Sequence, residues 1–289
     1  MEYLVAASLS EALEALGRQD AAVIAGGTDW FPAQGQRPLK GDLVDITRVP
    51  ELRGISRDTG DKGGWRIGGA TTWTDVIRAD LPPAFDGLKA AAREVGSIQI
   101  QNAGTIAGNL CNASPAADGV PPLLTLGAVV ELASTAGTRR MALSDFLKGP
   151  RQTARMPGEV LTALHVPDLP EAAQGAFLKL GAREYLVISI AMVAVVVTLD
   201  QGRIVQAAVA VGSCSAKAQR LPALEGDLAG RRAQDVLDAG AGIIASRHLA
   251  PLSPIADVRG SAEYRLEAAG TLCARALAMA IEQGEQSHG

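Results

Sequence analysis

The chain has few cysteines, few histidines and few aromatic residues. Its 289 residues include three cysteines and three histidines, and only 3% of the residues are aromatic. Cys111, Cys214 and Cys273 are odd in number and widely spaced, so they predict neither a disulfide framework nor a paired metal-binding motif. An iron–sulfur cluster or a zinc site therefore cannot be built from this chain alone. The scarcity of aromatic rings also leaves few platforms on which nucleic-acid bases could stack.

An excess of positive charge is missing as well. The chain has 27 Lys and Arg residues against 31 Asp and Glu residues, a net charge of -4. We therefore expect no nucleic-acid partner. The amino terminus carries an early glutamate and no basic segment, and the longest apolar stretch, residues 186–199, is too short to cross a bilayer. These features predict a cytoplasmic protein without an export signal or a membrane span.

Motifs of several enzyme classes are absent from the sequence. It contains no GxGxxG dinucleotide fingerprint, no GxxxxGK[ST] phosphate loop, no GxSxG nucleophile elbow and no HExxH metal helix. Hydrolase chemistry is thus not predicted. The histidines, His165, His248 and His288, are scattered, which favours surface or packing roles over metal ligation. A chain with so few catalytic side chains is best explained as the holder of a cofactor that does the chemistry itself.

Two glycine-bearing segments supply a place for such a cofactor. Residues 98–118 read IQIQNAGTIAGNLCNASPAAD, and residues 24–29 read IAGGTD. Glycine permits backbone geometries closed to other residues, and exposed N–H groups between glycines bind anions, most often phosphate. Either segment alone could be an ordinary surface turn. Two together predict binding loops for one ligand with two phosphates.

The apolar periodicity predicts a mixed order of helices and strands. In the first 170 residues we expect helices at 8–17, 74–80, 88–95 and 121–126, and strands at 21–25, 42–46, 65–70, 128–133 and 159–166. The turn-rich residues 57–64 predict a hairpin tip or a subdomain boundary. Beyond residue 175 we expect strands at 176–180, 188–199 and 203–212, with a hairpin turn at 200–202, and then helices at 232–237, 239–246 and 262–283. This last third is expected to be a strand meander covered by helices.

One family shows these motifs in the same order. Residues 25–29 (AGGTD), 102–109 (NAGTIAGN) and 113–118 (ASPAAD) resemble the FAD-binding medium subunit of molybdenum hydroxylases, the family of xanthine dehydrogenase and of the carbon monoxide dehydrogenase flavoprotein. Residues 69–72, 177–183 and 257–265 also resemble that family, so the resemblance runs end to end. It implies an α+β fold. Residues 1–56 and 57–167 would form a two-subdomain FAD-binding fold of the vanillyl-alcohol-oxidase (PCMH) type, and residues 172–289 a C-terminal β-meander packed with helices.

The resemblance also implies how FAD is held. Backbone N–H groups of residues 25–29 and 105–109 would bind the diphosphate from two sides, and Asp118 would take the ribose or adenine end. Lys179 and Leu161 would approach the flavin ring, where a lysine charge favours the reduced, anionic flavin, although Lys179 could also be a solvated lysine at a strand end. A side chain between Tyr185 and Ile188 would lie against one ring face. No catalytic or metal-binding residue is implied, and the implied cofactor-binding residues are Ile24, Ala25, Gly26, Gly27, Thr28, Asp29, Trp30, Gly104, Thr105, Ala107, Gly108, Asn109, Ser114, Asp118, Leu161 and Lys179.

The sequence departs from the family pattern at two places. Ala107 stands where the family has glycine, a change that fits only if residue 107 keeps an ordinary backbone conformation. Residues 185–187 (YLV) replace an acidic residue, and Arg183 stands alone where the family has paired arginines. The second departure leaves the electron acceptor open. Because neither glycine segment contains histidine, FAD is expected to be bound non-covalently.

The function implied by the resemblance is electron transfer within an oxidoreductase complex. A large partner would carry the molybdenum cofactor and a small partner 2Fe-2S clusters, in a dimer of heterotrimers, and FAD on this chain would pass electrons to NAD or another acceptor. An alternative is a self-sufficient FAD oxidoreductase of the same fold with its own small organic substrate, for which Tyr185 and His165 are the only acid–base candidates. A third possibility is a flavin-free assembly or scaffold protein.

Overall fold

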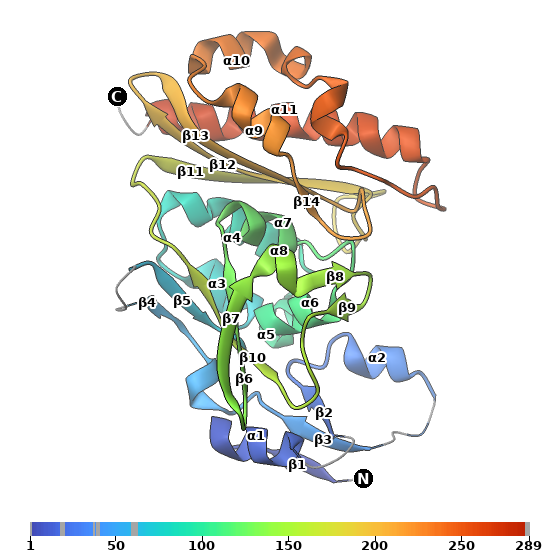
Figure 1. Ribbon diagram of the computed structural model, residues 1–289. Helices are drawn as coiled ribbons and strands as arrows, with labels where there is room; N and C mark the ends of the chain where they lie inside the picture. The colour runs from blue at the N-terminus through green and yellow to red at the C-terminus, as the bar shows by residue number, and fades with distance from the viewer. Residues whose placement is uncertain (1, 18–20, 37, 39–40, 59–62, 287–289) are drawn as a thin grey trace. The chain divides into compact units, whose positions relative to one another are not determined.

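The chain forms two compact units of mixed helices and strands (Figure 1). The computed structural model describes residues 2–17, 21–36, 38, 41–58 and 63–286. Unit 1 comprises Met1–Ala79, Ser97–Ala113 and Ala128–Asp168. Unit 2 comprises Asp80–Gly96, Ser114–Gly127 and Leu169–Gly289. The α+β class expected from the sequence is confirmed.

A small parallel sheet opens unit 1. Its strands lie in the order β1 (Tyr3–Val5), β3 (Asp42–Asp45) and β2 (Ala21–Ile24). Helix α1 (Leu9–Leu16) follows β1 and buries Ala12 and Leu16 in a cluster with Val44 of β3. The helix begins after Ser8 because the Ser8 side chain accepts the N–H of Glu11, and it lies within the helix expected at 8–17. Strand β1 and the short helix α2 (Trp30–Gln34) were not expected from the sequence.

An antiparallel sheet forms the rest of the framework of unit 1. Its strands lie in the order β4 (Ile55–Arg57), β5 (Trp65–Gly68), β10 (Val160–Val166), β6 (Val129–Ser134) and β7 (Gly137–Ala142). The central strand β10 is almost wholly buried, and it pairs with β5 along one edge and with β6 along the other. Strands β4 and β5 pair antiparallel on either side of the segment where a hairpin was predicted, and residues 59–62 of that segment lie outside the described residues.

Unit 2 is built on one four-stranded antiparallel sheet. Its strands lie in the order β11 (Ala173–Leu180), β12 (Ala191–Asp200), β13 (Arg203–Gly212) and β14 (Gln219–Arg220). Gln201 and Gly202 close the hairpin between β12 and β13 with φ angles of 47° and 71°. Two positive φ angles give the turn whose twist matches the flanking strands. The predicted meander is therefore confirmed.

Helices cover both faces of this sheet. Val193 and Val195 of β12 point to one face and share a buried cluster with the long helix α11 (Ala262–Gln286). Met192 and Ala194 alternate to the other face, where they meet Ala91 of α4 (Asp86–Glu94). Successive side chains of a strand point to opposite faces, so a strand as apolar as β12 must be covered on both.

Two helices that cover this sheet come from residues outside the C-terminal domain expected from the sequence. Helices α4 and α7 (Val120–Thr125) come from residues assigned above to the second FAD-binding subdomain, yet both belong to unit 2 and pack on its sheet. Outside the unit 2 segments Asp80–Gly96 and Ser114–Gly127, which contain these helices, the residues of the two predicted subdomains lie together in unit 1. The chain passes to the C-terminal part of unit 2 at residues 168–169.

Local structure differs from expectation at two further places. Residues 98–112 form helices α5 (Ile98–Ala103) and α6 (Ile106–Asn112) rather than an open loop, because Ser97 and Thr105 cap them. The helix expected at 239–246 is replaced by two 3-10 turns, η3 (Gly240–Ile243) and η4 (Ser246–Leu249). The other elements are η1 (Pro50–Leu52), α3 (Trp73–Arg78), η2 (Pro83–Phe85), α8 (Leu143–Phe146), β8 (Leu147–Gly149), β9 (Gln152–Thr153), α9 (Pro222–Leu228) and α10 (Ala233–Ala239).

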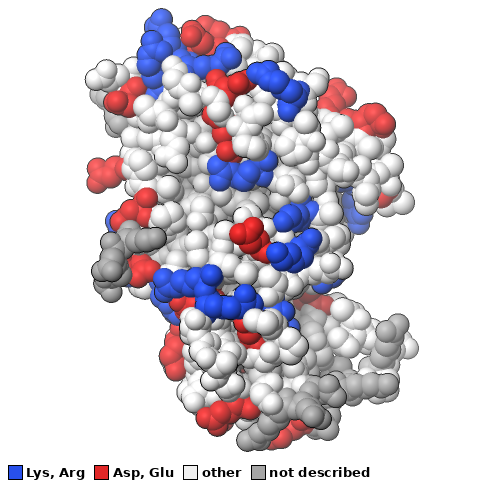
Figure 2. All heavy atoms as spheres, viewed as in Figure 1, with Lys and Arg blue, Asp and Glu red and all other residues white. Residues whose placement is uncertain are grey.

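Two further features concern the surface charge and the length and polarity of the helices. On the face drawn in Figure 2, basic and acidic side chains are intermingled rather than gathered by sign. Within the part of the chain that the structure describes, every helix is too short or too polar to cross a membrane.

Candidate functional site

The first glycine segment is a turn that leaves its amide groups open. It joins β2 to α2 in unit 1, and Gly27 has a φ of 67°, which side chains other than glycine rarely adopt. Among the described residues, no acceptor takes the N–H groups of residues 26–29. Neighbouring N–H groups without internal acceptors are the feature by which a backbone turn binds an anion. This half of the predicted loop pair therefore has the donors that a diphosphate needs.

Most N–H groups of residues 105–109 in the second segment already donate hydrogen bonds to oxygens of the protein. The N–H groups of Ile106 and Ala107 donate to the carbonyl oxygens of Thr71 and Gly69, at 3.0 and 3.1 Å. Those of Gly108 and Asn109 donate to the side-chain and backbone oxygens of Thr105. We expected the N–H groups of residues 105–109 to hold a diphosphate. This does not fit residues 106–109, because each backbone N–H is a single donor and these four already have acceptors. Of these five residues, Thr105 alone has an N–H without an acceptor in the described structure.

The two segments nevertheless lie against each other within unit 1. A Cβ atom placed on Gly26 would lie 2.5 Å from the carbonyl carbon of Ala103 and closer still to its oxygen. A Cβ atom on Gly104 would lie 3.4 Å from the hydroxyl oxygen of Thr28. Glycines at 26 and 104 are what allow two backbones to approach this closely. Segments about eighty residues apart in the chain are thereby brought into one place.

A buried polar atom on α6 lacks a partner. Asn109 Oδ1 is shielded from solvent and accepts no hydrogen bond from any described residue. Burying such an atom without a partner costs free energy, so it marks a place where a bound molecule could donate. The chemistry of unit 1 thus fits a dinucleotide with a diphosphate. It offers open backbone donors, close-packed glycines and an unpartnered acceptor.

The other predicted residues of unit 1 are more enclosed. Ile24 and Leu161 are both only 2% exposed, so their side chains belong to the protein core. Ala107 is 4% exposed and lies inside α6 with a right-handed backbone, which meets the condition set for an alanine at this position. Trp30 lies in α2, edge to face with Phe31 at a centroid distance of 5.0 Å. Contacts of these residues with a cofactor stay predictions.

In unit 2, Asp118 and Lys179 are partners of each other. Lys179 Nζ donates to Asp118 Oδ2 at 2.8 Å and to the Glu94 carbonyl oxygen at 3.3 Å. Ser189 Oγ donates to the other carboxylate oxygen of Asp118 at 2.6 Å. Two residues joined in this way cannot lie at opposite ends of an extended dinucleotide, as the resemblance implied. Sequence reasoning also missed Ser189, which no motif marks. The remaining predicted residue, Ser114, accepts the Ala116 N–H in a local turn.

Burial dominates the electrostatics of this pair. It raises the pKa of Asp118, while the Lys179 charge and the hydrogen bonds from Lys179 and Ser189 act in the opposite direction. Both side chains are about nine-tenths buried or more. Removing one partner would therefore leave a charge in a site with little access to water.

The two acid–base candidates of a self-sufficient enzyme are poorly suited to the task. Both ring nitrogens of His165 are engaged, Nδ1 with Asp58 at 2.7 Å and Nε2 with Glu131 at 3.0 Å. Tyr185 is 66% exposed, and its hydrogen bond with Glu184 raises its pKa. His165 thus has no free ring nitrogen and the Tyr185 hydroxyl is less acidic than usual, so the structure gives this alternative no support.

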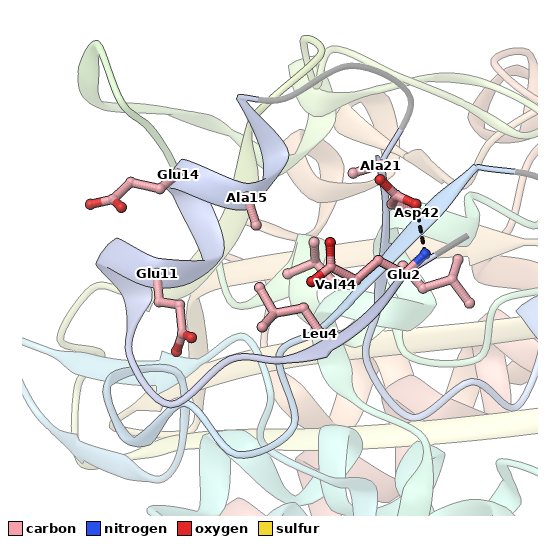
Figure 3. Close-up of a pocket in the computed structure, with 9 residues that line it drawn as sticks. Glu2, Leu4, Glu11, Glu14, Ala15, Ala21, Asp42 and Val44 are labelled. Atoms are coloured by element: carbon pink, nitrogen blue, oxygen red, sulfur yellow. Dashed lines mark hydrogen bonds between the residues drawn. The ribbon is translucent and has the colours of Figure 1, made fainter.

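A hollow elsewhere in unit 1 has the wrong charge for a diphosphate. It has a volume of about 150 Å³ and lies between α1 and the first sheet (Figure 3). Its walls include apolar side chains and four carboxylates, namely those of Glu2, Glu11, Glu14 and Asp42. Like charges repel, and an anionic ligand would be disfavoured here.

Known proteins match this chain along most of its length. The family model for the FAD binding domain in molybdopterin dehydrogenase matches residues 1–169, and that for the CO dehydrogenase flavoprotein C-terminal domain matches residues 176–280. The chain belongs to the FAD-binding molybdopterin dehydrogenase family. The family resemblance read from the glycine segments is thereby confirmed.

Other members of the family are similar throughout. The glyceraldehyde dehydrogenase medium chain of Sulfolobus acidocaldarius is 32% identical over 95% of this chain and 96% of its own length. The carbon monoxide dehydrogenase medium chain of Afipia carboxidovorans is 31% identical over 93% of each chain. A crystal structure of Cu,Mo-CO dehydrogenase superposes with a TM-score of 0.88 at 30% identity, covering 98% of both chains. This family member is accordingly an FAD-binding medium subunit of a molybdenum hydroxylase, and thus an oxidoreductase flavoprotein.

Proposed function

We propose that this chain is the electron-transfer subunit that stands between iron–sulfur clusters on a partner and NAD or another acceptor. The observation that carries the proposal is the contact in unit 1 between the turn at 26–29, with its open N–H groups, and the residues around Gly104. When bound there, FAD would supply the one- and two-electron chemistry that no side chain of this chain can perform.

Each part of unit 1 would contribute differently to binding. The N–H groups of residues 26–29 would donate to the diphosphate oxygens. The Gly104–Thr105 segment would form the facing wall and add the Thr105 N–H. Asn109 Oδ1 would accept a hydrogen bond from a hydroxyl or imino group of the cofactor. Binding would be non-covalent.

Two observations support the partners that we propose, namely the scarcity of metal-binding residues in this chain and the names of its relatives. This chain has three cysteines, all free in the structure, too few for a cluster with four cysteine ligands. One relative is named as a subunit of the 6-hydroxypseudooxynicotine dehydrogenase complex. We propose a large subunit with the molybdenum cofactor and a small subunit with 2Fe-2S clusters, assembled as a dimer of heterotrimers.

Two measurements test the proposal. The chain should co-purify with a molybdenum-containing and a cluster-containing polypeptide. A lone chain that turns over an organic substrate at full rate would instead support the self-sufficient enzyme. Anaerobic reduction of the flavin-loaded protein with dithionite, followed by NAD, should reoxidise the flavin if NAD is the acceptor. A flavin that stays reduced excludes NAD and leaves another acceptor.

A further inference from the structure

A single carboxylate holds both ends of an exposed loop in unit 2. The loop covers residues 181–188 of the connection 181–190 between β11 and β12. Lys179 lies just before it and Ser189 just after it, and the two donate to different oxygens of Asp118, at 2.8 and 2.6 Å. We infer that Asp118 is a positioning residue that fixes the conformation in which this loop presents its apolar side chains.

The loop has an ordered interior that such a clamp can orient. A Cβ atom on Gly181 would overlap Cγ1 of Val187, so these residues are packed together. Arg183 Nη2 donates to the Leu186 carbonyl oxygen at 2.5 Å. Leu186 has a φ of 53°, a left-handed conformation that costs a leucine free energy. Contacts elsewhere must offset that cost.

The outer side of the loop is apolar. Tyr185, Leu186 and Ile188 are 66%, 55% and 52% exposed. Three large apolar side chains exposed within four residues form a surface whose contacts depend on the loop conformation. The residue that fixes the loop therefore also fixes this surface.

The sheet below the loop does not depend on the clamp. The Ile190 N–H donates to the Leu180 carbonyl oxygen at 2.7 Å, and the Ile190 carbonyl oxygen accepts from Arg265 Nη1 at 2.5 Å. Strands β11 and β12 are also paired along their length, from Ala173 with Thr198 to Leu180 with Ala191, so they should stay paired when Asp118 is changed. Loss of the clamp should thus loosen residues 181–188 and leave the fold intact.

The test is amide hydrogen exchange of the full chain at equal flavin content. Asp118→Ala should speed exchange at residues 181–188 about tenfold or more, since two hydrogen bonds to a charged group are lost. Ser189→Ala and Lys179→Met should each give a smaller increase. Ser189→Thr, which keeps the hydroxyl, should exchange like the unchanged chain. Trypsin cleavage after Arg183 should follow the same order.

A double variant and a control make the result decisive. In the Asp118→Ala background, Ser189→Ala should have no further effect, because its acceptor is already gone. Glu225→Gln alters another ion pair of unit 2, with Arg220 at 2.5 Å, and should leave the loop unchanged. Unaltered loop exchange in Asp118→Ala, or a full additional effect of Ser189→Ala, would overturn the inference. If Asp118→Ala does not fold, the isosteric Asp118→Asn replaces it in the test. This variant loses the charge that Lys179 pairs with and should still speed exchange at residues 181–188. Unaltered exchange in Asp118→Asn would equally overturn the inference.

Discussion

Replacing Gly26 by alanine should push apart the two segments that the proposed cofactor site brings together. The added Cβ would lie 2.5 Å from the Ala103 carbonyl carbon and 2.9 Å from the Gly104 Cα. Both neighbours are backbone atoms, which cannot turn aside as a flexible side chain can. Gly26 does not have a positive φ, so alanine is acceptable to its own backbone and the cost is one of space alone.

The overlap in the structure gives the size of the loss in FAD affinity that Gly26→Ala should cause. Relieving the overlap requires one segment to move by about 1 Å, and overpacking of this kind costs about 1–3 kcal/mol or more. If the displaced segment is the one that meets the diphosphate, that free energy appears as weaker cofactor binding. At about 1.4 kcal/mol per factor of ten, FAD affinity should fall by about 5- to 150-fold.

The measurement is FAD content after purification, together with titration of the flavin-free chain with FAD. Gly242→Ala is the matched control, because Gly242 has an exposed position and a Cβ there meets nothing within 4 Å. The control should bind FAD as the unchanged chain does. Gly26→Ala with unaltered FAD affinity and content would refute the two-segment site, even if its thermal stability were lower.

Four further outcomes are expected. Thr105→Ala removes the acceptor of the Gly108 N–H and should lower the free energy of unfolding by about 1 kcal/mol in urea titrations, with Thr105→Ser close to unchanged. The hydrogen bond with Arg139 lowers the pKa of Glu159, so the ionised Glu159 should contribute fully to the free energy of unfolding at neutral pH. This contribution should be lost as the pH falls below the ordinary pKa of 4.5. The urea midpoints of Glu159→Gln and the unchanged chain should therefore differ at pH 7 and converge towards pH 3. Arg265→Met leaves the buried carbonyl oxygens of Ile190 and Ser213 without this donor and should cost about 3–5 kcal/mol in unfolding free energy. A cost below about 1 kcal/mol would show that these two hydrogen bonds do not stabilise the fold. FAD at 100 times its dissociation constant should stabilise the flavin-free chain by about 2.7 kcal/mol, and an unchanged melting temperature would favour the flavin-free scaffold.

Local sequence signals predicted the regular elements well. Ser8 before α1 and the Gln201-Gly202 turn between β12 and β13 act through bonds to near neighbours, so their effect is visible in the sequence. The same signals failed at residues 98–112, where glycine and asparagine indicated a loop. There Ser97 and Thr105 cap two helices, and the amides of residues 106–109 that the loop hypothesis assigned to a ligand donate instead to oxygens of Thr71, Gly69 and Thr105.

The sequence by itself determined the family, the class of fold and the need for a cofactor, because glycine spacing, strand alternation and missing motifs are local properties of the chain. Only the tertiary structure decided which amides remain free, that Asp118 pairs with Lys179 and Ser189, and that α4 and α7 cover the sheet of unit 2. Each of these depends on contacts between residues far apart in the chain. Such contacts are set by the competition of many groups for the same space and the same donors, which no short stretch of sequence contains.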